Sequence, residues 1–248
     1  MVCKFSEDYF DHKKGKEITY TCKEKPVDAG YCIFHHPKYW RKNPEKISKK
    51  IKEKIIQITK EPIYFIGYNI PSIDLSGLNI YVPVYFTYAK FHGNTKLGKT
   101  IFHSFVDFSL AKFFESSSFI KSIFRGNAYF SFVTMFKEAN FRLAVFQKAL
   151  DFRDSEFKET ANFWATNYLD DADFSGSEFH SEADFRLSTF NKKAIFDYVK
   201  LHHGRFYGAK FRGPVFFRYA KIEIADFRQA TFDAKKDFHG IQILKNVE

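Results

Sequence analysis

The sequence predicts an all-β solenoid, and three observations lead to this fold class. Phe is unusually frequent, with 33 residues among 248, so a folded chain must bury many large rings. A large apolar residue opens a new unit every five or six positions, and these steps alternate between five and six from residue 75 to residue 201. Helices need apolar spacings of three and four, and strands need a spacing of two. The third observation is a second, smaller residue in each unit.

This smaller residue stands two positions before the large one. Ala139 precedes Phe141 and Ala161 precedes Phe163, and a polar residue such as Asn140 lies between the two apolar positions. In an extended segment, residues two apart point to the same face. The small and large side chains are therefore expected inside a narrow coil, with the polar residue outside.

The stretches "ADFSGSEFHSE" at 172–182 and "SIDLSGL" at 72–78 carry a family resemblance. The chain resembles the pentapeptide-repeat family, whose unit reads roughly A-(D/N)-(L/F)-x-x, in a Phe-rich variant whose repeat is eleven residues long. The resemblance covers about residues 72–243 and implies a right-handed quadrilateral β-helix. One coil then consists of sides of five, six, five and six residues, and we expect the extra residue at a bulged corner in every other side. We assign residues 71–248 to this β-helix.

The alternation slips after Leu201, where two five-residue steps follow one another between residues 196 and 211. One interpretation is a plain five-residue side with a local change in coil shape. The alternative is a functional kink or binding notch within 201–217, where Gly204, Gly208, Gly213 and Pro214 are concentrated.

Residues 1–70 lack the repeat and are assigned to a small Cys/His module with one basic capping helix. All three cysteines lie here, at Cys3, Cys22 and Cys32, close to His35 and His36. Three thiolates and one imidazole suit a tetrahedral structural zinc site, and we predict Cys3, Cys22, Cys32 and His35 as its ligands, with His36 as the alternative histidine. The stretch "GYCIFHHPKYW" resembles the leader of archaeal pentapeptide-repeat proteins. The alternative is that the cysteines are small core residues.

A basic amphipathic helix is expected after Asn43, a good N-cap that is followed by Pro44. Ile47, Ile51, Ile55 and Ile58 form its apolar stripe. Its lysines are candidate contacts for nucleic acid or another anionic partner: Lys46, Lys49, Lys50, Lys52 and Lys54. The alternative is a solvated face on a helix that caps the solenoid.

The net charge and its distribution along the sequence restrict the possible functions. The net charge is +10, and its distribution along the sequence is banded: residues 151–200 carry 6 Lys/Arg and 11 Asp/Glu, whereas residues 201–248 carry 9 and 5. The best-known members of the family imitate duplex DNA towards type II topoisomerases, which needs an acidic rod, so the positive charge disfavours that role here. No apolar run long enough to span a membrane and no signal peptide is found, and a cytoplasmic protein without membrane contact is expected.

No phosphate-binding loop, nucleophile elbow or HExxH helix occurs in the sequence, and we expect no enzyme activity. The first functional hypothesis is a non-catalytic scaffold that binds an unknown protein partner. The alternative is a nucleic-acid or ribosome-associated protein that binds through its basic ends. We also expect a homodimer through the C-terminal end of the rod, where Ile241, Ile243, Leu244 and Val247 either join a second copy or lie across the last coil.

Overall fold

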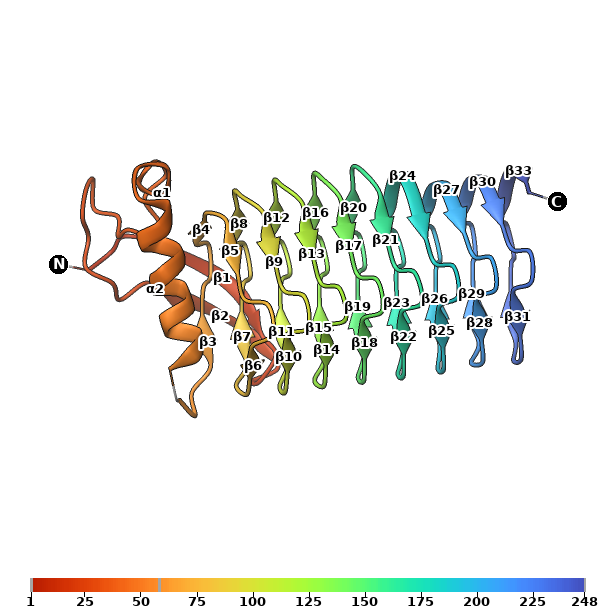
Figure 1. The fold of residues 1–248 in the computed structure, drawn as a ribbon, viewed down its shortest axis with the longest axis horizontal. Helices are drawn as coiled ribbons and strands as arrows, with labels where there is room; N and C mark the ends of the chain where they lie inside the picture. Colours follow the sequence, from red (N-terminus) through yellow and green to blue (C-terminus); the bar gives the residue numbers. More distant parts are fainter. Residues whose placement is uncertain (1, 58, 248) are drawn as a thin grey trace.

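The computed structural model describes residues 2–57 and 59–247 as a long solenoid with a small module at its N-terminal end (Figure 1). Each coil has four sides, and each side contributes a short strand to a ladder that runs along the rod. The first ladder is a nine-stranded sheet: β3 (Ile63–Tyr64), β7 (Val84–Tyr85), β11 (Val106–Asp107), β15 (Ala128–Tyr129), β19 (Leu150–Asp151), β23 (Ala172–Asp173), β26 (Ala194–Ile195), β29 (Val215–Phe216) and β32 (Lys236–Asp237).

The second and third ladders merge into one sheet towards the C-terminal end. The second begins with β4 (Asn69–Ile70), β8 (Lys90–Phe91), β12 (Lys112–Phe113), β16 (Thr134–Met135) and β20 (Glu156–Phe157). The third begins with β5 (Ile73–Asp74), β9 (Thr95–Lys96), β13 (Ser117–Ser118), β17 (Ala139–Asn140) and β21 (Ala161–Asn162). Both continue into the long strands β24 (Glu178–Asp184), β27 (Lys200–Arg205), β30 (Lys221–Asp226) and β33 (Gln242–Asn246).

The fourth ladder has eight strands: β6 (Asn79–Ile80), β10 (Ile101–Phe102), β14 (Ile123–Phe124), β18 (Val145–Phe146), β22 (Asn167–Tyr168), β25 (Thr189–Phe190), β28 (Lys210–Phe211) and β31 (Thr231–Phe232). All four ladders pair in parallel, and each residue meets its counterpart from the next coil, as Phe102 meets Phe124. The all-β solenoid predicted from the sequence is confirmed.

The coil becomes shorter by one residue at β24. Phe157 pairs with Phe179, which keeps the longer interval of the earlier coils. Phe179 also keeps that interval in its pair with Leu201, but the register then shifts, so that Glu182 pairs with His203 across an interval one residue shorter. From β24 onward, one continuous strand replaces the two short strands and the intervening bend of the earlier coils, and in β27 this strand is one residue shorter than in β24. The slip in the sequence pattern is therefore the loss of one residue from the coil, as the plain five-residue interpretation predicted.

The first coil has the same shorter interval. Ile63 pairs with Val84, whereas Val84 pairs with Val106 across the longer interval of the regular coils. The longer coil is thus confined to the part of the rod between this first coil and β24. The shorter coil occurs at both ends, next to the N-terminal module and next to the C-terminus.

The extra residue of the six-residue sides is not held as a bulge in each ladder. The register is regular from β5 to β21, and the chain forms a bend between the strands of each six-residue side, as between β20 and β21. Five-residue sides instead contain a tight turn with a left-handed residue, such as Leu110 at φ 61° and Phe132 at φ 57°. The two kinds of corner alternate, and this alternation explains the five–six rhythm of the sequence.

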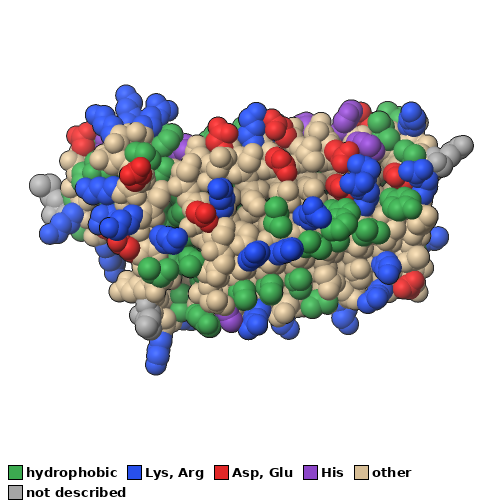
Figure 2. All heavy atoms as spheres, viewed as in Figure 1, with side chains coloured by type: hydrophobic (Ala, Val, Ile, Leu, Met, Phe, Trp, Pro, Cys, Tyr) green, Lys and Arg blue, Asp and Glu red, His purple; other side chains and the backbone are tan. Residues whose placement is uncertain are grey.

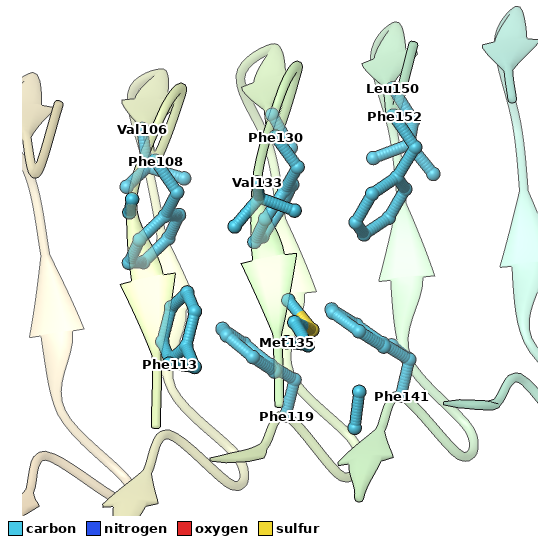
Figure 3. Packing of buried hydrophobic residues seen from close by; sticks show 14 of the residues in the cluster. Val106, Phe108, Phe113, Phe119, Phe130, Val133, Met135, Phe141, Leu150 and Phe152 are labelled. Atoms are coloured by element: carbon cyan, nitrogen blue, oxygen red, sulfur yellow. The ribbon is translucent and has the colours of Figure 1, made fainter. Parts of the chain in front are cut away.

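The axis of the solenoid is filled by columns of stacked rings (Figure 3). Phe119 stacks on Phe141 with ring centroids 4.5 Å apart, and Phe141 stacks on Phe163 at 5.1 Å. The neighbouring column, which contains Phe130 and Phe152, meets the first edge to face. The rings are fully buried, and so are the small residues two positions before them, as predicted.

Where the small residue is Ser or Thr, its hydroxyl in most cases donates to a carbonyl oxygen of the preceding coil. Ser155 donates to the carbonyl oxygen of Phe130 at 2.7 Å, and Ser188 donates to that of Phe163 at 2.6 Å. Tyr168 differs, because its hydroxyl is buried in the Phe column and has no hydrogen-bond partner among the described residues. A buried hydroxyl without a partner lowers stability.

The N-terminal module closes the first coil. After the short helix α1 (Tyr39–Lys42), helix α2 (Pro44–Ile56) packs Ile47, Ile51 and Ile55 into the same core as the first rings of the solenoid. Ile58, the fourth residue of the predicted stripe, lies outside the described residues. Asn43 is the N-cap of α2, but its side chain makes no capping hydrogen bond. The first ladder strand begins at Ile63, so the first coil starts before the boundary predicted at residue 71.

A β-hairpin of β1 (Ser6–Asp11) and β2 (Lys16–Thr21), which sequence analysis did not predict, lies along the first coils (Figure 1). At its tip the hydroxyl of Tyr85 donates to Asp11 at 2.8 Å, and the His12 ring stacks on Tyr129 at 3.5 Å. The hairpin thus holds the module against successive coils. No helix within residues 2–57 and 59–247 is long and apolar enough to cross a membrane.

Candidate metal centre and charged surfaces

The four predicted metal ligands converge at the base of the hairpin. Cys3 precedes β1 and Cys22 follows β2, and the antiparallel pairing of Ser6 with Thr21 brings these two ends together. Cys32 and His35 lie in one turn, in which the backbone N–H of His35 points to the carbonyl oxygen of Cys32. Chain segments that are far apart in sequence therefore bring one group of ligands together.

The distances within the group are short and similar. The Sγ atoms of Cys22 and Cys32 are 3.8 Å apart. The Nδ1 atom of His35 lies 3.7 Å from the Sγ of Cys3 and 3.2 Å from that of Cys32. All four ligand atoms lie within 4.8 Å of one another, and all four residues are buried. This group could hold a metal ion.

Neighbouring groups fix the orientation of the His35 ring. Its Nε2 lies 2.9 Å from the carbonyl oxygen of Ile66, to which it can donate, so Nδ1 is left as the free ligand atom. The ring stacks on Phe5 at 3.8 Å. Gly67, at φ +66°, makes room for Phe5, because a Cβ at this position would collide with the Phe5 ring.

His36, the alternative ligand, points elsewhere. Its Nε2 lies 3.1 Å from a carboxylate oxygen of Asp28, and its Nδ1 accepts hydrogen bonds from the backbone N–H groups of Lys38 and Tyr39. Both ring nitrogens are therefore used within the module. Among the described residues, the geometry brings His35 and not His36 to the cysteines.

The Cys22 and Cys32 sulfurs lie close enough for the proton of one thiol to point to the other. The contact with Cys32 lowers the pKa of Cys22, and the same contact, together with burial, raises the pKa of Cys32 to about 12. A metal ion binds thiolates and would displace this proton. Four protein ligands in a buried site leave no open position for a substrate, so the arrangement suits a structural ion.

The predicted contact lysines of α2 do not form one free group. Lys46, Lys49, Lys50 and Lys52 are exposed, with Lys49 4.0 Å from Glu53, and Lys and Arg side chains gather over this end of the molecule (Figure 2). Lys54 instead forms an ion pair with Glu24 at 2.7 Å and lies over the Phe34 ring. Its charge is used to hold the helix on the module.

A groove of about 820 Å³ lies between β2, α2 and the first coil, and four tyrosines line it: Tyr9, Tyr20, Tyr64 and Tyr68. Burial raises the pKa of each of these phenols. Raised values keep the phenols protonated at neutral pH, so they supply no general base.

A second cluster was not singled out from the sequence: Glu156, Glu178 and His180 place ligand atoms within 4.8 Å of one another. His180 is exposed, and both carboxylates already form ion pairs, Glu156 with Lys158 and Glu178 with Lys200. The cluster is therefore a solvated set of charges on the outside of the rod.

At the C-terminal end, the structure differs from one alternative of the sequence analysis. Residues 242–246 do not lie across the last coil but extend the ladder as β33, which pairs with β30. Leu244 is 81% exposed and Ile243 is 38% exposed. The homodimer through this end stays a prediction.

The comparisons with known proteins concern the solenoid. Residues 196–241 match the family model of pentapeptide repeats (9 copies). No curated protein matches the chain. Since the family match begins at residue 196, the resemblance of the leader to archaeal proteins stays a prediction.

Among solved structures, the chain is similar to HetL, a pentapeptide repeat protein involved in heterocyst differentiation regulation from the cyanobacterium Nostoc sp. strain PCC 7120. The identity is 15%, the match covers 75% of this chain and 82% of that chain, and the TM-score is 0.26, which is too low to support an assignment. The match to the family model of pentapeptide repeats covers residues 196–241, and these residues continue the ladders that begin at Ile63.

Proposed function

We propose that this chain is a non-catalytic scaffold that presents the outer faces of a rigid rod to a macromolecular partner. The observation that carries the proposal is the filled axis: columns of buried Phe rings leave the solenoid interior to side chains rather than to a substrate. Repeating coils then offer long, regular outer faces, which is how other solenoids bind their partners.

We further propose that the Cys/His group holds a structural zinc ion. In a tetrahedral site with Zn–S bonds of about 2.3 Å, two sulfurs lie about 3.8 Å apart. The separation of the Cys22 and Cys32 sulfurs is 3.8 Å, and the His35 nitrogen lies 3.7 Å from Cys3. Zinc would replace the thiol proton between Cys22 and Cys32 and fix the hairpin base to the first coil through the contact of His35 with Ile66.

The scaffold function is tested by capture from an extract of the native cell. The full chain is immobilised, and bound macromolecules are identified with and without nuclease treatment. Stoichiometric retention of one macromolecule supports a scaffold, and the nuclease arm separates a protein partner from a nucleic acid. Conversion of a small molecule by the purified chain, with no macromolecule retained, would contradict the proposal.

A further inference from the structure

The charges of the solenoid are sorted by face. We define the cationic face as the fourth ladder with the turn before each strand and the bend after it, which comprises residues 75–82, 97–104, 119–126, 141–148, 163–170, 185–192, 206–213 and 227–234. This face carries ten Lys or Arg residues and two acids, Asp170 and Asp233. The intervening segments of the rod, up to residue 247, carry fourteen Lys or Arg and sixteen Asp or Glu.

The acidic band in the sequence is therefore not an acidic band in space. Within residues 151–200, Asp170 is the one acid on the cationic face, and the other ten lie on the remaining sides. Lys192 from the same range adds positive charge to this face, whereas Arg186 is paired with Asp184 at 2.7 Å. Figure 2 shows Lys and Arg side chains along the lower margin of the rod, near the strands of this ladder in Figure 1. A positive surface thus covers much of this side of the rod, and it is interrupted at residues 163–170, where Asp170 is the one charged residue.

The basic side chains form two rows. The row beside the turns contains Lys99, Lys121 and Arg142, one from each of three successive coils. The row beside the bends contains Arg125, Lys148, Lys192 and Arg212. Between the rows, the strands place uncharged, half-buried side chains outward: Ile101, Ile123 and Val145.

These seven basic residues, and Lys210 on β28, are exposed, and within residues 2–57 and 59–247 none forms an ion pair with a carboxylate. Their side-chain contacts are to neutral groups: Arg142 lies over the Trp164 ring at 4.4 Å, and Arg212 donates to the side-chain oxygen of Asn191 at 3.0 Å. Coils lie about 4.8 Å apart, so like charges stand close together. A polyanion along this face would relieve their repulsion.

We propose that the cationic face binds a single strand of nucleic acid, with phosphates along the basic rows and bases against the uncharged strip. This inference rests on the proposed scaffold function and names its partner class. Seven coil steps at about 4.8 Å give a straight face roughly 34 Å long. The phosphates of a duplex wind away from a straight face within a few base pairs, whereas a flexible single strand follows all eight coils. Rows of cations with interleaved aromatic side chains such as Trp164 are the combination that binds single strands without sequence preference.

The test measures the affinity of the full chain for a fluorescent 20-nucleotide single strand of thymidines, at salt concentrations from about 50 to 200 mM. The variant Lys121→Ser/Arg125→Ser/Arg142→Ser removes three charges from the cationic face. The matched control, Lys46→Ser/Lys49→Ser/Lys50→Ser, removes three charges from α2. We expect the first variant to bind roughly tenfold or more weakly at low salt and to reduce the slope of log Kd against log salt by about 2, since each lost phosphate contact contributes about 0.7. The control should change the affinity less than about twofold.

Three results would overturn the proposal: no binding of the single strand at 50 mM salt, an equal or larger loss in the α2 variant, or tighter binding of a 20-base-pair duplex than of the single strand. A polyglutamate chain of equal charge that competes as well as the oligonucleotide would also overturn it, in favour of an acidic protein. Unchanged thermal unfolding of both variants shows that charge rather than folding is measured. A negative result in this binding test does not contradict the scaffold function, because capture from the extract tests the scaffold function separately.

Discussion

The Nε2 atom of His35 lies 2.9 Å from the carbonyl oxygen of Ile66, and this contact joins the Cys/His group to the first coil of the solenoid. Ile66 lies in the turn that follows β3, so the histidine is held by the rod and the cysteines by the hairpin and its flanking segments. Metal binding at this group would therefore be coupled to docking of the N-terminal module.

The first prediction concerns this coupling. Purified protein should contain about one zinc ion per chain, and Cys22→Ser should lose it, because three ligands hold a structural ion poorly. Removal of zinc should increase hydrogen exchange in residues 2–36 and leave the ladders from β7 onward protected. Metal analysis together with hydrogen–deuterium exchange provides the measurement.

The matched control is His36→Ala, which removes the neighbouring imidazole that contacts Asp28. This variant should retain zinc, whereas His35→Ala should not. Zinc loss in the His36 variant alone would show that the histidine ligand has been misassigned. A zinc-free wild type with a protected hairpin would rule out the metal site.

The second prediction concerns the Phe columns. Phe163 is stacked between Phe141 and Phe185, at 5.1 and 4.7 Å. Phe163→Ala should lower the free energy of unfolding by about 3–5 kcal/mol, because a cavity remains inside a packed column. The control Gln147→Ala changes an exposed side chain and should cost less than about 0.5 kcal/mol. Denaturant unfolding of both variants checks the difference, and equal losses would contradict the inward assignment.

The third prediction uses two tyrosines in opposite situations. Tyr168 buries a hydroxyl without a partner among the described residues, so Tyr168→Phe should stabilise the protein by about 1 kcal/mol. The hydroxyl of Tyr85 donates to the buried carboxylate of Asp11 at 2.8 Å, so Tyr85→Phe should destabilise it by about 1–3 kcal/mol. Thermal unfolding of the two variants should therefore shift in opposite directions. Shifts of the same sign would mean that the Tyr168 hydroxyl is satisfied in solution.

The fourth prediction concerns pH and the hairpin. Burial alone would raise the pKa of Asp11, but hydrogen bonds from Tyr85 and from the backbone N–H groups of Lys14 and Lys13 bring that pKa below its usual range. An Asp with a lowered pKa in the folded state adds stability above the unfolded value of about 3.9 and loses it as the pH falls through the folded value. Hairpin docking should therefore weaken below about pH 4.

Asp11→Asn isolates this contribution, because other carboxylates titrate in both proteins. The unfolding temperature of the variant should be lower than that of the wild type at pH 7, and the difference should shrink as the pH falls below about 4. A difference that stays constant between pH 7 and pH 2.5 would show that the ionisation of Asp11 does not support the hairpin.

The inward residues of the solenoid could be located from the sequence because the same pattern, a small residue two positions before a large apolar one, recurs in most units. The four Cys/His residues that the structure brings together could also be found, since clustered cysteines near a histidine are a local signal. The hairpin was missed because its contacts, such as His12 with Tyr129, join residues far apart in sequence and outside the repeat. The cationic face was missed because charge was counted along the sequence, whereas each coil distributes a stretch of sequence over four sides.

The last prediction concerns the change in coil length at β24. This strand pairs with β20 and β21 across the longer interval, as in Phe157 with Phe179, and the register against β27 shifts between Phe179 and Glu182. Deleting Ser181 would align β24 with β27 throughout and would move the mismatch one coil back. There the bend that begins at Lys158, between β20 and β21, already holds an extra residue outside the ladders. The deletion should therefore lower the unfolding temperature by only a few degrees, equivalent to about 1–2 kcal/mol.

The control for this prediction is deletion of Asn167, which would shorten the step from Phe163 to Tyr168 by one residue and would turn a column position outward. That variant should lose cooperative unfolding or unfold at a much lower temperature. A large ring would leave the core, and the rings stacked above and below it would then face a cavity. Circular dichroism during heating measures both variants. A Ser181 deletion as damaging as the Asn167 deletion would show that the coil length is fixed at this position, because the bend before β21 could then not absorb the mismatch.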